Sequence, residues 1–140
     1  MGAAAARVKV NRTNGKIKVK RICAAFDIGT VINHRTATAC IRGGIIWGLG
    51  YILKEKIELD GYGCYTEFLS DYNIPRFSDM PPIDIDFLDN QAPGAPRGCG
   101  ELPLIPTIAA IANAVYHAVG VRFYSTPITP ERMLEALRKI

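Results

Sequence analysis

The residues from which proteins build most metal sites are scarce in this chain. Its 140 residues include only two histidines, His34 and His117. The four cysteines, at positions 23, 40, 64 and 99, are far apart, and no two form a Cys-x-x-Cys pair. This spacing argues against a zinc ribbon, a thioredoxin-like motif and an iron–sulfur cluster held by closely spaced cysteines. We expect reduced thiols, no metal ligated by the protein, and a cytoplasmic location.

Long hydrophobic runs are missing as well. The longest apolar stretch, residues 43–53, has eleven residues and contains four glycines, whereas a membrane span needs about 20 apolar residues. The short apolar segment at residues 3–6 is followed, not preceded, by basic residues, unlike a signal peptide. The sequence therefore predicts a protein without a membrane partner.

Acidic residues are absent from the first 21 positions, which contain seven lysines and arginines. A basic segment of this kind has two interpretations: a nucleic-acid-binding arm, or a solvated strand whose lysines protect an edge. The second is favoured because Lys16, Lys18 and Lys20 alternate with Ile17 and Val19, as in a strand. We therefore expect no nucleic-acid partner.

The composition, 49% hydrophobic and 21% charged, is that of a globular protein. We interpret residues 1–140 as a single domain, with residues 1–15 partial or not native. Alternating segments and turn residues predict one hairpin from residues 7–10 and 16–27, a second from 56–59 and 65–69, and a strand near 83–87. Predicted helices cover residues 36–54, 104–119 and 130 to the end. The order predicts an α+β fold of mostly antiparallel strands with a glycine-rich helix and two C-terminal helices.

The first of these helices contains Gly43, Gly44, Gly48 and Gly50. Each glycine inside a helix costs about 1 kcal/mol relative to alanine. Such a cost indicates that another backbone or a ligand approaches this helix closely. We expect Gly43, Gly44 and Gly50 to share one face, with Cys40 on the inner side of the helix.

Three stretches have the character of a functional site: Asp27-x-Gly29 followed by Asn33, then residues 71–75 (Asp-Tyr-Asn-Ile-Pro), and residues 98–104 (Gly-Cys-Gly-Glu-Leu-Pro-Leu). Glu101 lies in the third, just before an apolar helix. Spacing alone favours a helix-capping acid there. The competing interpretation is a general base carried on a glycine-flanked loop.

These stretches occur in a particular order with the Gly-Gly-Ile-Ile-x-Gly-Leu-Gly helix and, near the end, Pro-Ile-Thr-Pro-Glu. In that combination residues 16–140 resemble the molybdenum hydroxylases, the family of xanthine dehydrogenase and aldehyde oxidase. The resemblance is to the C-terminal end of the molybdopterin-binding large subunit. It implies that this chain is one part of a larger enzyme, inactive by itself.

The resemblance assigns the catalytic base to Glu101 and cofactor contacts to Cys40 and Gly100. Cys40 departs from the family, where a glutamine is common, and a thiol offers no amide donor–acceptor pair. Arg42 also departs, since a glutamate is frequent there. Neither histidine matches a catalytic position.

The implied function is hydroxylation of an aldehyde or N-heterocycle with water as the oxygen source. The implied cofactor is molybdopterin, with iron–sulfur clusters and FAD on other domains or subunits. The implied partners are the remaining segments or subunits, a small-molecule substrate and, for the isolated chain, a second copy. A non-catalytic α+β subunit-interaction module is the alternative. The sequence does not specify the substrate.

Overall fold

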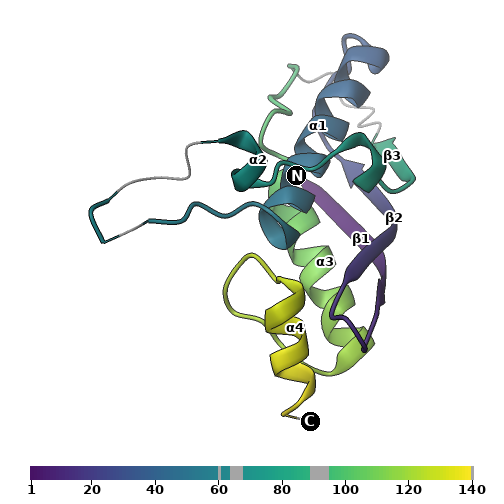
Figure 1. The fold of residues 1–140 in the computed structure, drawn as a ribbon. Helices are drawn as coiled ribbons and strands as arrows, with labels where there is room; N and C mark the ends of the chain where they lie inside the picture. The colour runs from purple at the N-terminus through teal and green to yellow at the C-terminus, as the bar shows by residue number, and fades with distance from the viewer. Residues whose placement is uncertain (60, 64–67, 89–94, 140) are drawn as a thin grey trace.

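A computed structural model describes residues 1–59, 61–63, 68–88 and 95–139 (Figure 1). The elements follow the order β1 (Gly2–Val10), β2 (Ile17–Phe26), α1 (His34–Leu53), α2 (Leu69–Tyr72), a 3-10 turn (Phe77–Asp79), β3 (Ile83–Phe87), α3 (Leu104–Val119) and α4 (Pro130–Leu137). One face of a small sheet carries the helical layer, in which α3 packs on β1 and α1 packs on α3. The α+β class is confirmed.

The first predicted hairpin forms, and its first strand is longer than expected. Strands β1 and β2 pair antiparallel along their whole lengths, with one irregularity beside Arg7. The side-chain oxygen of Asn11 accepts hydrogen bonds from the backbone N–H groups of Thr13 (2.9 Å) and Asn14 (3.3 Å). Gly15 completes the turn with a φ of 69°, a conformation that glycine adopts at little cost.

The third strand differs from the expected topology, because β3 pairs with β2 in parallel. A parallel pair requires a crossover connection of a dozen or more residues, and α1 lies within the segment that joins β2 to β3. The sheet is therefore mixed, with one antiparallel and one parallel pairing among the described strands, rather than mostly antiparallel.

The second predicted hairpin is wrong for its described residues. Residues 55–59 form no strand, and Leu69 begins the short helix α2. Positions 65–67 lie outside the described residues. Ile57 and Leu59 are 57% and 63% exposed, so their alternation with polar residues buries neither of them. Period-two alternation predicts a strand only where a core covers one face.

Residues with four-residue spacing on α1 form the centre of the core. Ile41, Ile45 and Leu49 are buried there together with Ile22 and Phe26 of β2. Helix α3 adds Ile111 and Val115, and α4 adds Met133. By length and composition α1 is apolar enough to span a membrane. The apolar segment is therefore longer than the eleven residues, 43–53, that the sequence analysis identified. Its buried stripe packs against the sheet and α3, as in the core helix of a folded domain.

The helix ends agree well with the sequence. The side chain of Asn33 caps α1 by accepting from the N–H of Thr36 at 3.0 Å. Helix α3 has the predicted bounds. Thr129 caps α4 and Pro130 occupies its first turn, as the Thr-Pro-Glu sequence predicts.

Candidate functional site

The loop that carries Glu101 lies directly on the glycine-rich face of α1. Gly44 is buried, and a Cβ atom placed on it would lie 2.8 Å from Cγ of Pro103 and 3.3 Å from the carbonyl oxygen of Gly100. At Gly48, one turn on, a Cβ would lie 3.2 Å from the carbonyl oxygen of Leu104. These two glycines therefore let the loop and the start of α3 approach the α1 backbone.

The four glycines do not act alike, however. A Cβ on Gly43 would meet nothing within 4 Å, so Gly43 does not share the packed face. Gly50 packs instead against the Glu55 side chain and Pro75, where its Cβ would lie 2.7 Å from Cγ of Pro75. The expectation that Gly43, Gly44 and Gly50 form one face is therefore wrong, because close neighbours occur at Gly44, Gly48 and Gly50.

Cys40 is brought to the same loop. Its thiol lies 3.9 Å from the carbonyl oxygen of Cys99, a weak contact that joins α1 to the residue two positions before Glu101. Burial raises the pKa of the Cys99 thiol, and the neighbouring Cys40 thiol adds to the effect. Cys40 itself is exposed, as is Cys23. Cys64 lies outside the described residues.

Glu101 is exposed and does not cap the following helix. The N-cap of α3 is Pro103, and no side chain donates or accepts at that helix end. The contribution of Glu101 to the helix start is its backbone carbonyl, which accepts from the N–H of Leu104 at 3.1 Å. Within the described residues its carboxylate has no hydrogen-bond or ion-pair partner. The capping interpretation that spacing favoured is therefore wrong.

Gly100, beside it, also faces open space, since a Cβ there would meet nothing within 4 Å. The same holds for Gly98. The loop thus presents bare backbone on both sides of Cys99, together with a carboxylate that has no partner in the part of the chain that the structure describes.

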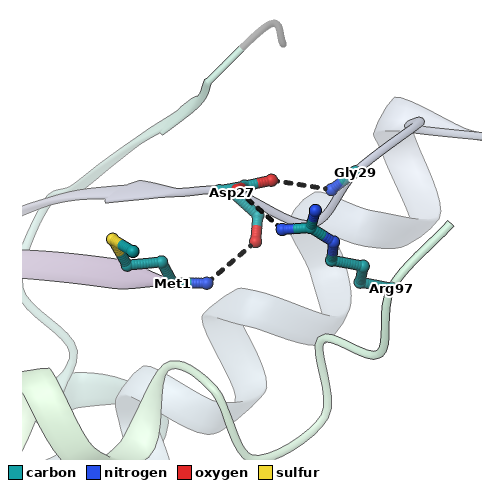
Figure 2. Close-up of polar contacts among 4 residues, drawn as sticks. All are labelled: Met1, Asp27, Gly29 and Arg97. Atoms are coloured by element: carbon teal, nitrogen blue, oxygen red, sulfur yellow. Dashed lines mark hydrogen bonds and ion pairs between the residues drawn. The ribbon is translucent and has the colours of Figure 1, made fainter. Parts of the chain in front are cut away.

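Asp27 anchors the chain that leads into this loop (Figure 2). One carboxylate oxygen accepts from the N–H of Gly29 at 3.0 Å, and the other pairs with the guanidinium of Arg97 at 2.8 Å. The N–H of Arg97 in turn donates to the carbonyl oxygen of Ile28 at 2.8 Å. Gly29 has a φ of 67°, and a Cβ there would collide with the carbonyl oxygen of Ala95. The first sequence stretch is therefore joined to the residues just before the third.

The role of Asp27 was not predicted, although its stretch was selected as site-like. The signal was present in the Asp-x-Gly sequence, which is typical of a carboxylate accepting from the N–H two residues on. Its second partner, Arg97, is 70 positions away. Pairing across that distance cannot be read from one sequence.

The middle stretch lies at the other end of α1 from Cys40. The Tyr72 hydroxyl donates to the Glu55 carboxylate at 2.9 Å, and this hydrogen bond, with some burial, raises the pKa of Tyr72. Pro75 packs near Gly50. These contacts give residues 71–75 a structural role at the end of α1, and none of them involves Glu101.

The histidines have packing contacts. His34 stacks edge-on against Phe87 with ring centroids 5.6 Å apart, and the rings of His117 and Tyr116 are 6.0 Å apart. Among the residues that the structure describes, no three His, Cys, Asp or Glu side chains gather where they could hold a metal ion. Arg42 is exposed on α1.

This arrangement can bind a cofactor through its backbone and place one carboxylate beside it. The open backbone at Gly98 and Gly100 would admit a bulky group close to the loop, and the Glu101 carboxylate is free to meet it. Cys40 fits a polar cofactor less well, because a thiol is only a weak hydrogen-bond donor and acceptor.

Comparison with known proteins identifies relatives of this chain. Residues 1–81 match the family model of the molybdopterin cofactor-binding domain. The chain is 34% identical over 137 residues to the aldehyde oxidoreductase molybdenum-binding subunit of Escherichia coli, covering 93% of this chain and 19% of that protein. It is 35% identical over 132 residues to a subunit of nicotinate dehydrogenase from Pseudomonas putida, covering 94% and 11%.

A solved structure gives the same result in three dimensions. Quinoline 2-oxidoreductase from Pseudomonas putida 86 superimposes with a TM-score of 0.84 at 33% identity, over 94% of this chain and 18% of that chain. The chain therefore spans less than a fifth of the length of these three relatives.

Proposed function

This chain belongs to the molybdopterin cofactor-binding domain family, and we propose that it forms the part of a molybdenum hydroxylase that supplies the general base, Glu101. The remaining segments of the enzyme would complete the cofactor site. The reaction is the hydroxylation of an aldehyde or an N-heterocycle, with water as the source of oxygen.

One observation carries the proposal: Glu101 is an exposed carboxylate without a partner among the described residues, on a loop that is fixed at both ends. Before it, Arg97 is held by Asp27 and Ile28. After it, Pro103 packs on Gly44. A base must be held within a fraction of an ångström of its working position, and packing of the flanking residues provides this.

The carboxylate has the properties that proton transfer requires. Its two oxygens have no partner among the described residues, so the Glu101 side chain can accept a proton from a group within hydrogen-bond reach. Its Oε atoms would then accept the proton that water loses as its oxygen attacks the substrate carbon.

The molybdenum cofactor, when bound, supplies the two-electron oxidation of the substrate. On this chain we propose that the backbone at Gly100 and the thiol of Cys40 would contact it. Because Cys40 offers no amide, we propose that segments outside these 140 residues provide most of the hydrogen bonds to the cofactor.

The proposed substrate class is supported by the names of the relatives, which include an aldehyde oxidoreductase, a nicotinate dehydrogenase and a quinoline oxidoreductase. Iron–sulfur and flavin groups on other domains or subunits would carry electrons away. A chain that holds one wall of the site lacks preorganisation of the rest. The isolated 140 residues should therefore fold and show no hydroxylase activity; stoichiometric molybdenum or aldehyde turnover with them would contradict this.

The experiment is Glu101→Gln in the complete enzyme, with Glu135→Gln on α4 as the matched charge control. The amide keeps the size of the side chain and removes the base, so kcat should fall by about 100- to 10,000-fold with molybdenum content unchanged. Glu135 is exposed and pairs with Lys139, so its variant should retain turnover. If Glu101→Gln retained turnover, the chain would be better described as a non-catalytic subunit-interaction module.

A further inference from the structure

Two cysteine thiols meet where the Glu101 loop lies against α1. The Cys40 thiol is 3.9 Å from the carbonyl oxygen of Cys99, and it also forms a hydrogen bond with the Cys99 thiol. Both cysteines are free thiols here, although 59 positions separate them in the sequence. The proposed function assigns Cys40 a contact with the cofactor, but it gives Cys99 no role.

The packing of α1 explains why these thiols lie so close. Cys40 and Gly44 are four residues apart, so they share one face of the helix. A Cβ on Gly44 would lie only 3.3 Å from the carbonyl oxygen of Gly100, the residue after Cys99. The loop backbone therefore approaches the helix closely along this face. A disulfide bond needs such an approach, because its two Cα atoms are usually about 4.4–6.8 Å apart.

The two thiols differ in their surroundings. Cys40 is exposed, so a small oxidant can reach it. Cys99 is half-buried, and this burial, with the hydrogen bond to Cys40, raises the pKa of the Cys99 thiol. A raised pKa lowers the fraction of thiolate, which is the form that reacts with peroxides. Cys40 is therefore the thiol that a peroxide oxidises first, and Cys99 is the neighbour that completes the reaction.

We infer that Cys40 and Cys99 form a reversible disulfide bond when the protein meets a peroxide. In the first step the Cys40 sulfur attacks hydrogen peroxide, the O–O bond breaks, and a sulfenic acid on Cys40 and one water form. In the second step the Cys99 sulfur attacks that sulfenic acid, the S–O bond breaks, and the disulfide bond and a second water form. The two thiols together lose two electrons and two protons, and the peroxide gains them.

The bond would join the loop that carries Glu101 covalently to α1, two residues before the carboxylate. It would also remove the free thiol of Cys40 from the surface of the helix. A consequence of this link for catalysis rests on the proposed function. Formation of the bond depends only on the two thiols, so it can be measured whether or not Glu101 is the base.

Oxidation of the 140-residue chain with hydrogen peroxide, followed by tryptic digestion and mass spectrometry, tests this inference. Trypsin cuts after lysine and arginine, so each of the four cysteines lies in a different peptide. The Cys40–Cys99 link should exceed every other pairing at least about tenfold, because these two thiols are already in contact. Dithiothreitol should reverse it. In concentrated urea the pairing should shift toward cysteines that are closer in sequence, such as Cys23 with Cys40, because shorter loops close more readily.

Cys99→Ser removes the second thiol, so peroxide should leave Cys40 as a sulfenic acid that dimedone traps. The matched control is Cys23→Ser. Cys23 is also exposed, but its thiol donates to Asp84 at 3.4 Å on the sheet. This variant should form the Cys40–Cys99 bond at the rate of the parent.

Three results would overturn the inference. The first is oxidation of Cys40 without a link to Cys99 in the folded chain. The second is the same distribution of pairings with and without urea, which would show that the fold does not bring the two thiols together. The third is an equal loss of the bond with Cys23→Ser and with Cys99→Ser.

Discussion

Substituting alanine for Gly44 tests the packing of the Glu101 loop on α1. The added Cβ would lie 2.8 Å from Cγ and 3.2 Å from Cβ of Pro103, and 3.3 Å from the carbonyl oxygen of Gly100. Two of these neighbours belong to a rigid ring and one is backbone, so none can move away alone. Overpacking of this kind costs about 1–3 kcal/mol. Alanine has a higher helix propensity than glycine, which offsets about 1 kcal/mol of this cost. We therefore expect the free energy of unfolding to fall by up to about 2 kcal/mol.

Gly43→Ala is the matched control, because it makes the same change one residue earlier in the same helix. A Cβ on Gly43 would meet nothing within 4 Å. Only the propensity term acts there, so this variant should be more stable than the parent by about 0.5–1 kcal/mol. The two variants should therefore differ by about 1–3 kcal/mol.

Urea denaturation followed by circular dichroism measures this difference, with thermal unfolding as a second readout. For a chain of this length 1 kcal/mol corresponds to a change in Tm of about 3–5 °C. If Gly44→Ala proved as stable as Gly43→Ala, the loop would not pack on α1 as described. The proposed fixation of Glu101 would then fail with it.

Two further predictions concern ion pairs. Asp27→Ala should lower the free energy of unfolding by about 1–2 kcal/mol, because it leaves both the Gly29 N–H and the Arg97 guanidinium without their partner. Arg97→Ala removes only the 61% exposed partner, so it should lower the free energy of unfolding by less than about 1 kcal/mol. Urea titration measures both changes. The hydrogen bond from Lys54 lowers the pKa of Asp79 in the folded state. The pair therefore contributes to folding stability above the pKa that Asp79 has in the unfolded chain, about 4. This contribution is lost as the pH falls toward the lower pKa of the folded state. The stability difference between the parent and Lys54→Met should therefore shrink below about pH 4 and stay constant from about pH 5 to 7; a difference that grew on acidification would contradict the pairing.

The sequence predicted those features of the fold that depend on local chemistry. Asn33, Thr129 and Pro130 mark helix starts through capping and a fixed φ, which neighbouring residues determine. The hairpin around Gly15 has the same local origin. The parallel pairing of β3 was missed because it depends on where α1 returns the chain, which is a property of the whole fold.

For the candidate site, the roles of Glu101 and Cys40 stay predictions. The structure shows that Cys40 on α1 contacts Cys99 of the loop that carries Glu101. Spacing suggested a capping role for Glu101, yet the helix start is occupied by Pro103. The partnership of Asp27 with Arg97 spans 70 positions, and nothing in either local sequence specifies it.

The most direct test of the proposed base is the rate at which substrate reduces the complete enzyme in a single turnover without an electron acceptor. Glu101 would take a proton during this reduction step. The measurement separates that step from electron transfer to the acceptor and from product release. With Glu101→Gln we predict a rate lower by about 100- to 10,000-fold at full molybdenum content. A rate within about threefold of the parent, at equal molybdenum content, would show that Glu101 is not the base.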